Sequence, residues 1–356
     1  MGISDRLLGK KNVNGKPHIE AVAPTAALPG GEVRITGHGL KPPELRRPRV
    51  QFGEVEGPVV IAADDFVIAR VPEGAMTGPV VVSTNGASSN PVEVKVAISI
   101  AENLHPVTNP ALDAEGNIYV TFSGSRGQKV PVSIYQIDTN YNVKPFLSEM
   151  MNATAIAFDR EGQMYVSSRY DGTVYRVARN GTMTAYAESM GIATGIAFDR
   201  EQNLYVGDRS GTIFKIDRSR QTFVFATLEP SISAYHLAFS PSGRLYVTGP
   251  TTSSFDSVYQ VSPQGEVSIF YRGLGRPQGI AFDVEGNLYV AASLGGRRGI
   301  VRLSPDRQPS LAIAGHGLVG LAFAPGRAAI LATAYPNTSG AVFHLSWGVP
   351  GQSLLE

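Results

Sequence analysis

Apolar and polar residues alternate along this chain in short runs, and one such run recurs along its length. The clearest copy reads GIAFDVEGNLYV and begins at Gly279. Its apolar residues lead into a polar turn at 284–287 and resume directly after it, which is the pattern of a β-hairpin. Five other copies begin at Asn109, Ala155, Gly195, His236 and Gly320. The chain is therefore predicted to repeat one unit of structure six times.

The repeats start 40 to 46 residues apart, and each period has room for four short strands. In the fifth repeat, the hairpin is followed by GIVRLSP from Gly299 and PSLAIAG from Pro309. No run has the periodicity of a helix, so the sequence predicts an all-β protein. A single four-stranded sheet cannot bury both of its faces, whereas six sheets stacked around an axis can. Residues 97–350 are thus expected to form a six-bladed β-propeller.

Residues on both sides of the repeats predict how this ring closes. The sixth repeat has no fourth strand after AVFHLSWG, which begins at Ala341. Ahead of the first repeat, AISIAENL from Ala97 resembles VSIFYRGL from Val267, which is a predicted fourth strand. We therefore expect residues 98–104 to complete the last blade and to tie the two ends of the ring together.

Residues 17–96 carry a separate alternating pattern. Apolar residues occupy every other position at Val33 and Ile35, and again at Val80 and Val82. Clusters of proline and glycine lie between these runs, as they do between the strands of a small β-sandwich.

This N-terminal segment also resembles the IPT/TIG family of immunoglobulin-like domains. The features that match are the Pro24 turn, Gly30–Gly31, Gly37 and Gly39 ahead of Leu40, Phe52–Gly53, Arg70–Val71–Pro72 and Thr77–Gly78. Domains of this family serve as spacers, dimerisation surfaces or binding modules. The resemblance therefore implies an immunoglobulin-like sandwich without catalytic residues.

Composition narrows the set of partners. The formal net charge of +1 provides no overall attraction to nucleic acid or to an anionic membrane. The absence of cysteine excludes disulfides, thiolate zinc sites and cysteine nucleophiles. No segment has the apolar core of a signal peptide or the ~20 apolar residues of a membrane span. We expect a soluble, cytoplasmic protein with tails at residues 1–16 and 351–356.

The repeat itself is similar to NHL-type propellers and to the gluconolactonase-like group. RPQGIAFDVEGNLYVAAS, from Arg276, carries this similarity best. The resemblance implies a propeller fold and leaves the activity open, because such propellers include calcium-dependent lactonases, lyases and binding platforms.

Lactonases of this kind hold a divalent cation on the propeller axis with acidic and amide side chains, and calcium requires such oxygen ligands. No carboxylate precedes any predicted inner strand here. The residues at these positions are Asn109, Thr154, Thr194, Tyr235, His236, Gln278 and Val319. We predict no metal cofactor. The alternative is a Ca²⁺-dependent lactonase-like hydrolase or lyase that uses Asn109 and Gln278 as ligands, together with His236.

Motifs of catalysis are otherwise missing from the sequence. It contains no GxSxG elbow, no HExxH pair and no phosphate-cradling glycine loop. The recurring aspartates of the hairpins are explained as turn formers, because Asp can accept hydrogen bonds from nearby turn amides. These aspartates are Asp113, Asp159, Asp199 and Asp283. The face of the propeller that carries them is called the turn face below.

Topology predicts the working surface on the opposite side. The loops that join strand four to the next strand one, and strand two to strand three, emerge together on this side, which we call the arginine face. Its candidate ligand-binding residues are Arg126, Arg169, Tyr170, Arg209, His236, Arg276, Gln278, Arg297, Arg298 and Tyr335. Because the guanidinium fork pairs with acidic groups, these residues predict a non-catalytic scaffold. Its partner is expected to be a protein or a small acidic or carbohydrate-type ligand, and not a nucleic acid.

Overall fold

The structure, a computed structural model, describes residues 16–42, 46–335 and 339–352. The chain forms two compact units, Met1–Val96 and Ala97–Glu356. Apart from one three-residue 3₁₀ helix at Pro325–Arg327, every regular element within these described residues is a β-strand. The prediction of an all-β protein is thus confirmed. No helix in the described ranges is long and apolar enough to cross a membrane.

The N-terminal unit consists of two sheets. One sheet has the order β1 (His18–Ala23), β3 (Glu32–His38), β7 (Phe66–Arg70) and β6 (Val59–Ala62). The other has the order β5 (Val55–Gly57), β4 (Arg49–Phe52), β8 (Gly78–Thr84), β10 (Val92–Val96) and β2 (Ala26–Ala27), with β9 (Ala87–Ser88) paired to β8. Alternating residues such as Val33, Ile35, Val80 and Val82 are fully buried, because one side of each strand forms the core.

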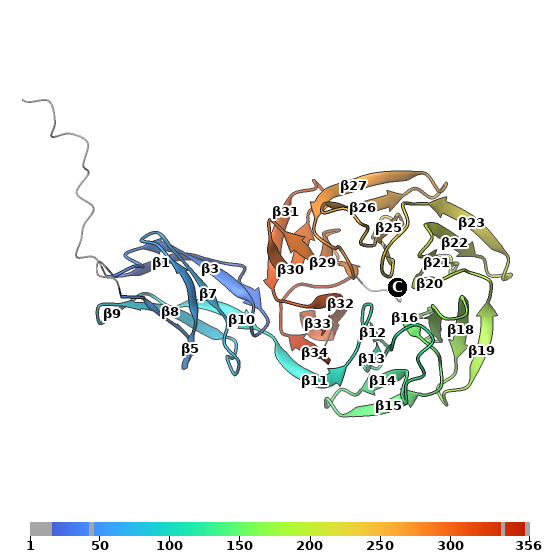
Figure 1. Cartoon of the computed structure of the whole chain (residues 1–356), viewed down its shortest axis with the longest axis horizontal. Coiled ribbons are helices and arrows are strands. Elements are labelled where there is room, and N and C mark those ends of the chain that lie inside the picture. The colour runs from blue at the N-terminus through green and yellow to red at the C-terminus, as the bar shows by residue number, and fades with distance from the viewer. Residues whose placement is uncertain (1–15, 43–45, 336–338, 353–356) are drawn as a thin grey trace, which may run out of the picture. The chain divides into compact units, whose positions relative to one another are not determined.

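The second unit contains six four-stranded antiparallel sheets arranged in a ring (Figure 1). Blade 1 comprises β12 (Ala111–Leu112), β13 (Ile118–Thr121), β14 (Ile134–Ile137) and β15 (Val143–Leu147). Blade 2 comprises β16 (Ala153–Phe158), β17 (Met164–Ser168), β18 (Thr173–Val177) and β19 (Met183–Ala187). Blade 3 comprises β20 (Ala193–Phe198), β21 (Leu204–Asp208), β22 (Thr212–Ile216) and β23 (Thr222–Thr227).

Blades 4 to 6 complete the ring. Blade 4 comprises β24 (His236–Phe239), β25 (Leu245–Thr248), β26 (Asp256–Val261) and β27 (Val267–Leu274). Blade 5 comprises β28 (Ile280–Phe282), β29 (Leu288–Leu294), β30 (Arg297–Leu303) and β31 (Pro309–Ala314). Blade 6 comprises β32 (Leu318–Ala324), β33 (Ala328–Thr333), β34 (Gly340–Leu345) and β11 (Ile98–Leu104).

The two ends of the propeller sequence meet in blade 6. Strand β11 pairs antiparallel with β34, from Ile98 opposite His344 to Leu104 opposite Gly340. Beyond β34 the chain continues to blade 5, where Gly351 forms a β-bridge with Asp283. The backbone N–H of Gln352 also donates to Phe282 O at 3.0 Å. Residues 351 and 352, predicted as part of a tail, are therefore held by backbone pairing.

Aromatic side chains join neighbouring blades at five of the six interfaces. A tyrosine in the second strand of blades 1 to 5 meets a phenylalanine of the next blade's first strand edge to face, with ring centroids 4.9 to 5.5 Å apart. At the sixth interface Ile330 occupies the tyrosine position and Leu112 the phenylalanine position. The interface between blades 6 and 1 is consequently an aliphatic cluster.

Near the axis, the first strands approach too closely for a side chain at some repeat positions. A Cβ at Gly279 would lie 2.1 Å from Asn109 Oδ1 and 2.5 Å from Gly320 Cα. Asn109 reaches this point because its Nδ2 donates to Ile280 O at 2.8 Å and its Oδ1 accepts from Leu321 N at 3.1 Å. One amide thus links the start of blade 1 to blades 5 and 6.

Gly279→Ala is therefore expected to lower the free energy of unfolding by about 1–3 kcal/mol, since overpacking forces backbone shifts. Chemical denaturation measures this change. Ala155→Gly is a matched control, because blade 2 already holds alanine at the same repeat position; it should lose less than about 1 kcal/mol. Equal losses for the two variants would contradict the close packing of Gly279.

Candidate ligand-binding site

Three of the predicted arginines come from neighbouring blades. Arg169 and Arg209 directly follow the second strands β17 and β21, so they occupy the same repeat position in blades 2 and 3. Arg126 lies in the loop between β13 and β14 of blade 1. Equivalent positions of adjacent blades are related by the rotation of the ring, which places these side chains on one face.

Asn152 holds the Arg126 loop in place. Its buried side chain donates through Nδ2 to Gly124 O at 3.1 Å and to Ser125 O at 3.0 Å. Its Oδ1 accepts from Gly127 N at 2.7 Å. Gly124 O also accepts from Arg169 Nη2 at 2.5 Å. The same short segment therefore binds Arg169 and positions Arg126 beside it.

The three guanidinium groups interact electrostatically. Burial lowers the pKa of Arg169, and the positive charges of Arg209 and Arg126 lower it further. In the described part of the chain, no carboxylate forms an ion pair with any of the three. Arg209 instead donates to a backbone carbonyl, from Nη2 to Ile232 O at 2.9 Å. This cluster, Arg126, Arg169 and Arg209, is called the triple-arginine cluster below.

The nearby acids are engaged in their own turns. Asp171 Oδ2 accepts from the Tyr175 hydroxyl at 2.7 Å. Asp208 Oδ1 accepts from Ile192 N at 2.8 Å, and its other oxygen accepts from the Ser210 hydroxyl. Their hydrogen bonds stabilise the loops that carry Arg169 and Arg209, and the positive charge of the cluster remains available to a ligand.

An exposed aromatic ring lies beside this cluster. Tyr170 follows Arg169 and is 48% exposed. A Cβ on Gly127 would be 3.7 Å from Tyr170 Cε2, so the ring packs next to the Arg126 loop. The site therefore combines positive charge with an apolar surface, which suits an acidic ligand that also has a ring or an apolar body.

The remaining predicted residues lie on other blades. Arg276 precedes β28, and Arg297 and Arg298 begin β30, so all three belong to blade 5. Tyr335 belongs to blade 6, where its hydroxyl donates to His316 O at 3.3 Å. The predicted set is thus distributed around the arginine face, and the structure gathers Arg126, Arg169, Tyr170 and Arg209 within it.

His236 is buried near the axis at 3% exposure, and no hydrogen bond is recorded for its Nε2. Burial lowers its pKa to about 3, so the imidazole is neutral at physiological pH. His236 therefore lies in the interior, and its role in ligand binding stays a prediction.

One of the two residues predicted for the alternative calcium site is engaged by backbone groups. Both ends of the Asn109 amide bind backbone groups, as described above. Gln278 bonds through its backbone, whose carbonyl accepts from Thr248 Oγ1 at 2.5 Å. Throughout the described residues there is no group of three or more acidic, histidine or cysteine side chains placed to hold a metal. The side-chain amide of Asn109 is thus engaged within the protein, and the calcium site stays a prediction.

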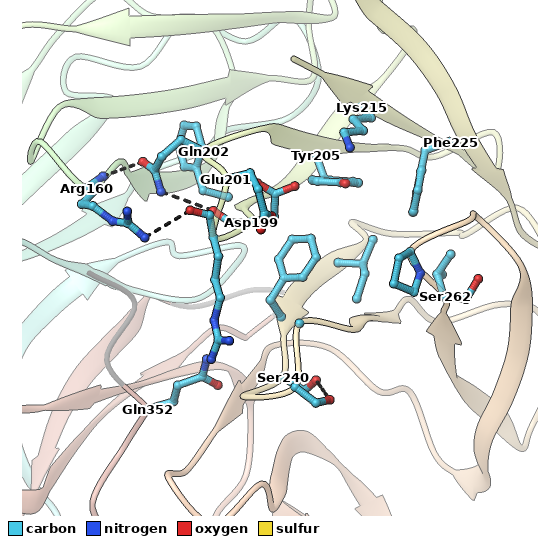
Figure 2. A pocket seen from close by; sticks show the side chains of 18 residues that line it. Arg160, Asp199, Glu201, Gln202, Tyr205, Lys215, Phe225, Ser240, Ser262 and Gln352 are labelled. Atoms are coloured by element: carbon cyan, nitrogen blue, oxygen red, sulfur yellow. Dashed lines mark hydrogen bonds between the residues drawn. The ribbon is translucent and has the colours of Figure 1, made fainter. Parts of the chain in front are cut away.

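A separate hollow of about 410 Å³ lies on the turn face, between blades 3 and 4 (Figure 2). Two of its charged residues, Arg160 and Asp199, are hydrogen-bonded within the protein. Arg160 donates from its backbone N to Gln202 Oε1 at 2.8 Å and from Nη2 to Arg200 O at 3.1 Å. Asp199 accepts from Asn203 N at 2.7 Å, as expected of a turn former. Cationic and anionic side chains both line this hollow, so it favours neither an anionic nor a cationic ligand.

Sequence reasoning missed two residues of the site, Asn152 and Ser123. Ser123 follows blade 1's second strand at the repeat position of Arg169 and Arg209, so an alignment of the repeats could have drawn attention to it. Asn152 has no equivalent signal, because its role depends on a loop that is specific to blade 1.

No protein-family profile and no curated protein sequence matches this chain. Solved structures resemble it in fold. A protein described as a candidate gluconolactonase has a TM-score of 0.59 at 15% identity, over 73% of this chain and 94% of that one. A Bacteroides thetaiotaomicron protein of unknown function has a TM-score of 0.57 at 15% identity, over 93% and 98%. An auxiliary nutrient binding protein from the same organism has a TM-score of 0.55 at 14% identity, over 94% and 98%.

At these identities the likeness concerns the fold alone. The chain is therefore an all-β protein with a β-propeller, similar in architecture to lactonase-like propellers and to nutrient-binding proteins. The finer resemblances, to IPT/TIG domains and to NHL repeats, stay predictions.

Proposed function

We propose that this protein is a non-catalytic binding protein whose arginine face holds a small acidic ligand. The observation that carries the proposal is the triple-arginine cluster, in which three positive charges from successive blades interact and none is paired with a carboxylate of the described residues. Like charges held side by side repel one another, and an anionic ligand relieves that repulsion. The similarity in fold to a nutrient-binding protein supports the same function.

The ligand is expected to be a sugar or a similar cyclic compound with acidic groups. Guanidinium groups recognise carboxylates and phosphates through two parallel hydrogen bonds. Tyr170 offers an exposed ring against which a sugar can pack. We further propose that residues 17–96 form an immunoglobulin-like domain of the IPT/TIG type, whose role is spacing or binding.

Calorimetric titration with a panel of neutral sugars, uronic acids and sugar phosphates tests the function. Acidic members should bind and neutral ones should not. Arg209→Met should weaken binding about tenfold or more, because a hydrogen bond to a charged group contributes about 1.5–3 kcal/mol. Raising the salt concentration should weaken it as well.

The control is Arg218→Met, which removes an exposed arginine from the turn between β22 and β23. It has the same effect on net charge and should leave affinity almost unchanged. Equal affinity for neutral and acidic sugars, or equal losses for the two variants, would refute a ligand site on the arginine face.

A further inference from the structure

We propose that Ser123 and Arg169 form a buried subsite for a phosphate monoester group of the ligand. The inference rests on the proposed function and names the acidic group that the triple-arginine cluster recognises.

Two buried polar atoms in this region have no recorded partner. Ser123 is 1% exposed and its Oγ makes no hydrogen bond, and Arg169 Nε is likewise buried without one. Buried polar groups are nearly always hydrogen-bonded to protein, water or a ligand. Each of these two atoms therefore needs a partner from outside the protein.

Gly124 connects the backbone next to Ser123 with the side chain of Arg169. It follows Ser123 in the chain, and its carbonyl accepts from Arg169 Nη2 at 2.5 Å. Arg169 uses Nη2 for this bond, so its guanidinium is fixed while Nε stays unpaired. Asn152 Nδ2 donates to the same Gly124 carbonyl at 3.1 Å. The subsite is thus built in advance by backbone and amide contacts.

The chemistry of the unpaired atoms specifies an acceptor. Arg Nε–H can only donate, and a serine hydroxyl can donate to the same acceptor. A water molecule would satisfy both atoms and leave three positive charges unbalanced. A carboxylate would balance one charge and has two oxygens. A phosphate monoester carries ≈ −1.5 to −2 charge at pH 7 and has three terminal acceptor oxygens, which matches this donor set best.

Titration calorimetry with inorganic phosphate, sulfate and glucuronate tests the subsite. Phosphate at pH 7.5 should bind at least tenfold more tightly than glucuronate. Its affinity should fall at pH 5.5, because the second ionisation of inorganic phosphate lies near neutral pH and the ion is almost entirely the monoanion at pH 5.5. Sulfate stays dianionic, so its affinity should be the same at pH 7.5 and pH 5.5.

Ser123→Ala should weaken phosphate binding about tenfold and leave glucuronate binding within twofold. Ser125→Ala is the control, since Ser125 is an exposed neighbour in the same loop. Arg169→Lys keeps the charge but lacks Nε, and should weaken phosphate binding by more than tenfold. Unchanged thermal unfolding would show that the variants are folded.

The outcomes separate the two proposals. If glucuronate binds as tightly as phosphate and Ser123→Ala matches Ser125→Ala, the subsite holds water and this inference is wrong, while acidic-ligand binding stands. If neither anion binds, both proposals fail.

Discussion

Replacing Ile100 and Leu104 together by alanine is expected to lower the free energy of unfolding of the propeller by about 5 kcal/mol. Each loss of a buried aliphatic side chain costs about 2–5 kcal/mol, and neighbouring losses are not fully additive. Both side chains are buried in the cluster with Ile118, Ile137 and Ile330 that closes blade 6 onto blade 1. Strand β11 is therefore expected to hold the ring shut.

Urea unfolding followed by tryptophan fluorescence measures this effect. Trp347 is the single tryptophan, and it stacks on Phe323 with centroids 5.8 Å apart and meets Tyr289 edge to face at 4.9 Å. Its emission thus reports on blades 5 and 6.

The matched control is Glu102→Ala, an exposed change in the same strand, which should shift stability by at most about 0.5 kcal/mol. If the double variant unfolds at the same urea concentration as this control, strand β11 does not secure the ring. Deleting residues 97–104 should lower the melting temperature still more.

Acidification is expected to destabilise the protein through His236. Burial lowers the pKa of this imidazole in the folded state to about 3, whereas the unfolded chain titrates near the ordinary value of 6.5. Below pH 6.5 the unfolded state therefore binds a proton that the folded state excludes. The stability due to neutral His236 is complete above pH 6.5. It should fall by about 1.4 kcal/mol per pH unit as the pH decreases toward 3.

Comparison with His236→Asn isolates this contribution, because the variant carries no titrating group and Asn109 occupies the same repeat position in blade 1. The difference in unfolding free energy between the two proteins should shift by about 2–3 kcal/mol between pH 6.5 and pH 4.5. Burial also lowers the pKa of His344, but this residue is present in both proteins and its effect cancels. A difference that stays constant with pH would show that His236 is accessible to protons.

The architecture was largely predictable, because its signals are local. A hairpin such as residues 279–290 is encoded by alternation around a turn, and its recurrence every 40 to 46 residues sets the number of blades. Strand β11 could be identified in the same way, since its sequence resembles β27. Such patterns can be recognised without knowing which residues are neighbours in space.

The site was predictable only in part. Loop topology placed Arg169 and Arg209 on one face, because equivalent repeat positions follow the symmetry of the ring. It did not distinguish them from Arg276, Arg297 and Arg298, which belong to blade 5. That distinction depends on which side chains approach one another, and sequence spacing does not contain this information.

By itself, the sequence determined that this protein is all-β, that it repeats six times and that one propeller face is rich in arginine. Tertiary structure alone decided that Asn109 binds backbone groups, that His236 is interior and that Asn152 and Arg169 both bind the loop of Arg126. The physical reason is that strand patterns depend on each residue's own neighbours in the chain. Hydrogen bonding, burial and charge coupling depend instead on residues that the closed ring brings together.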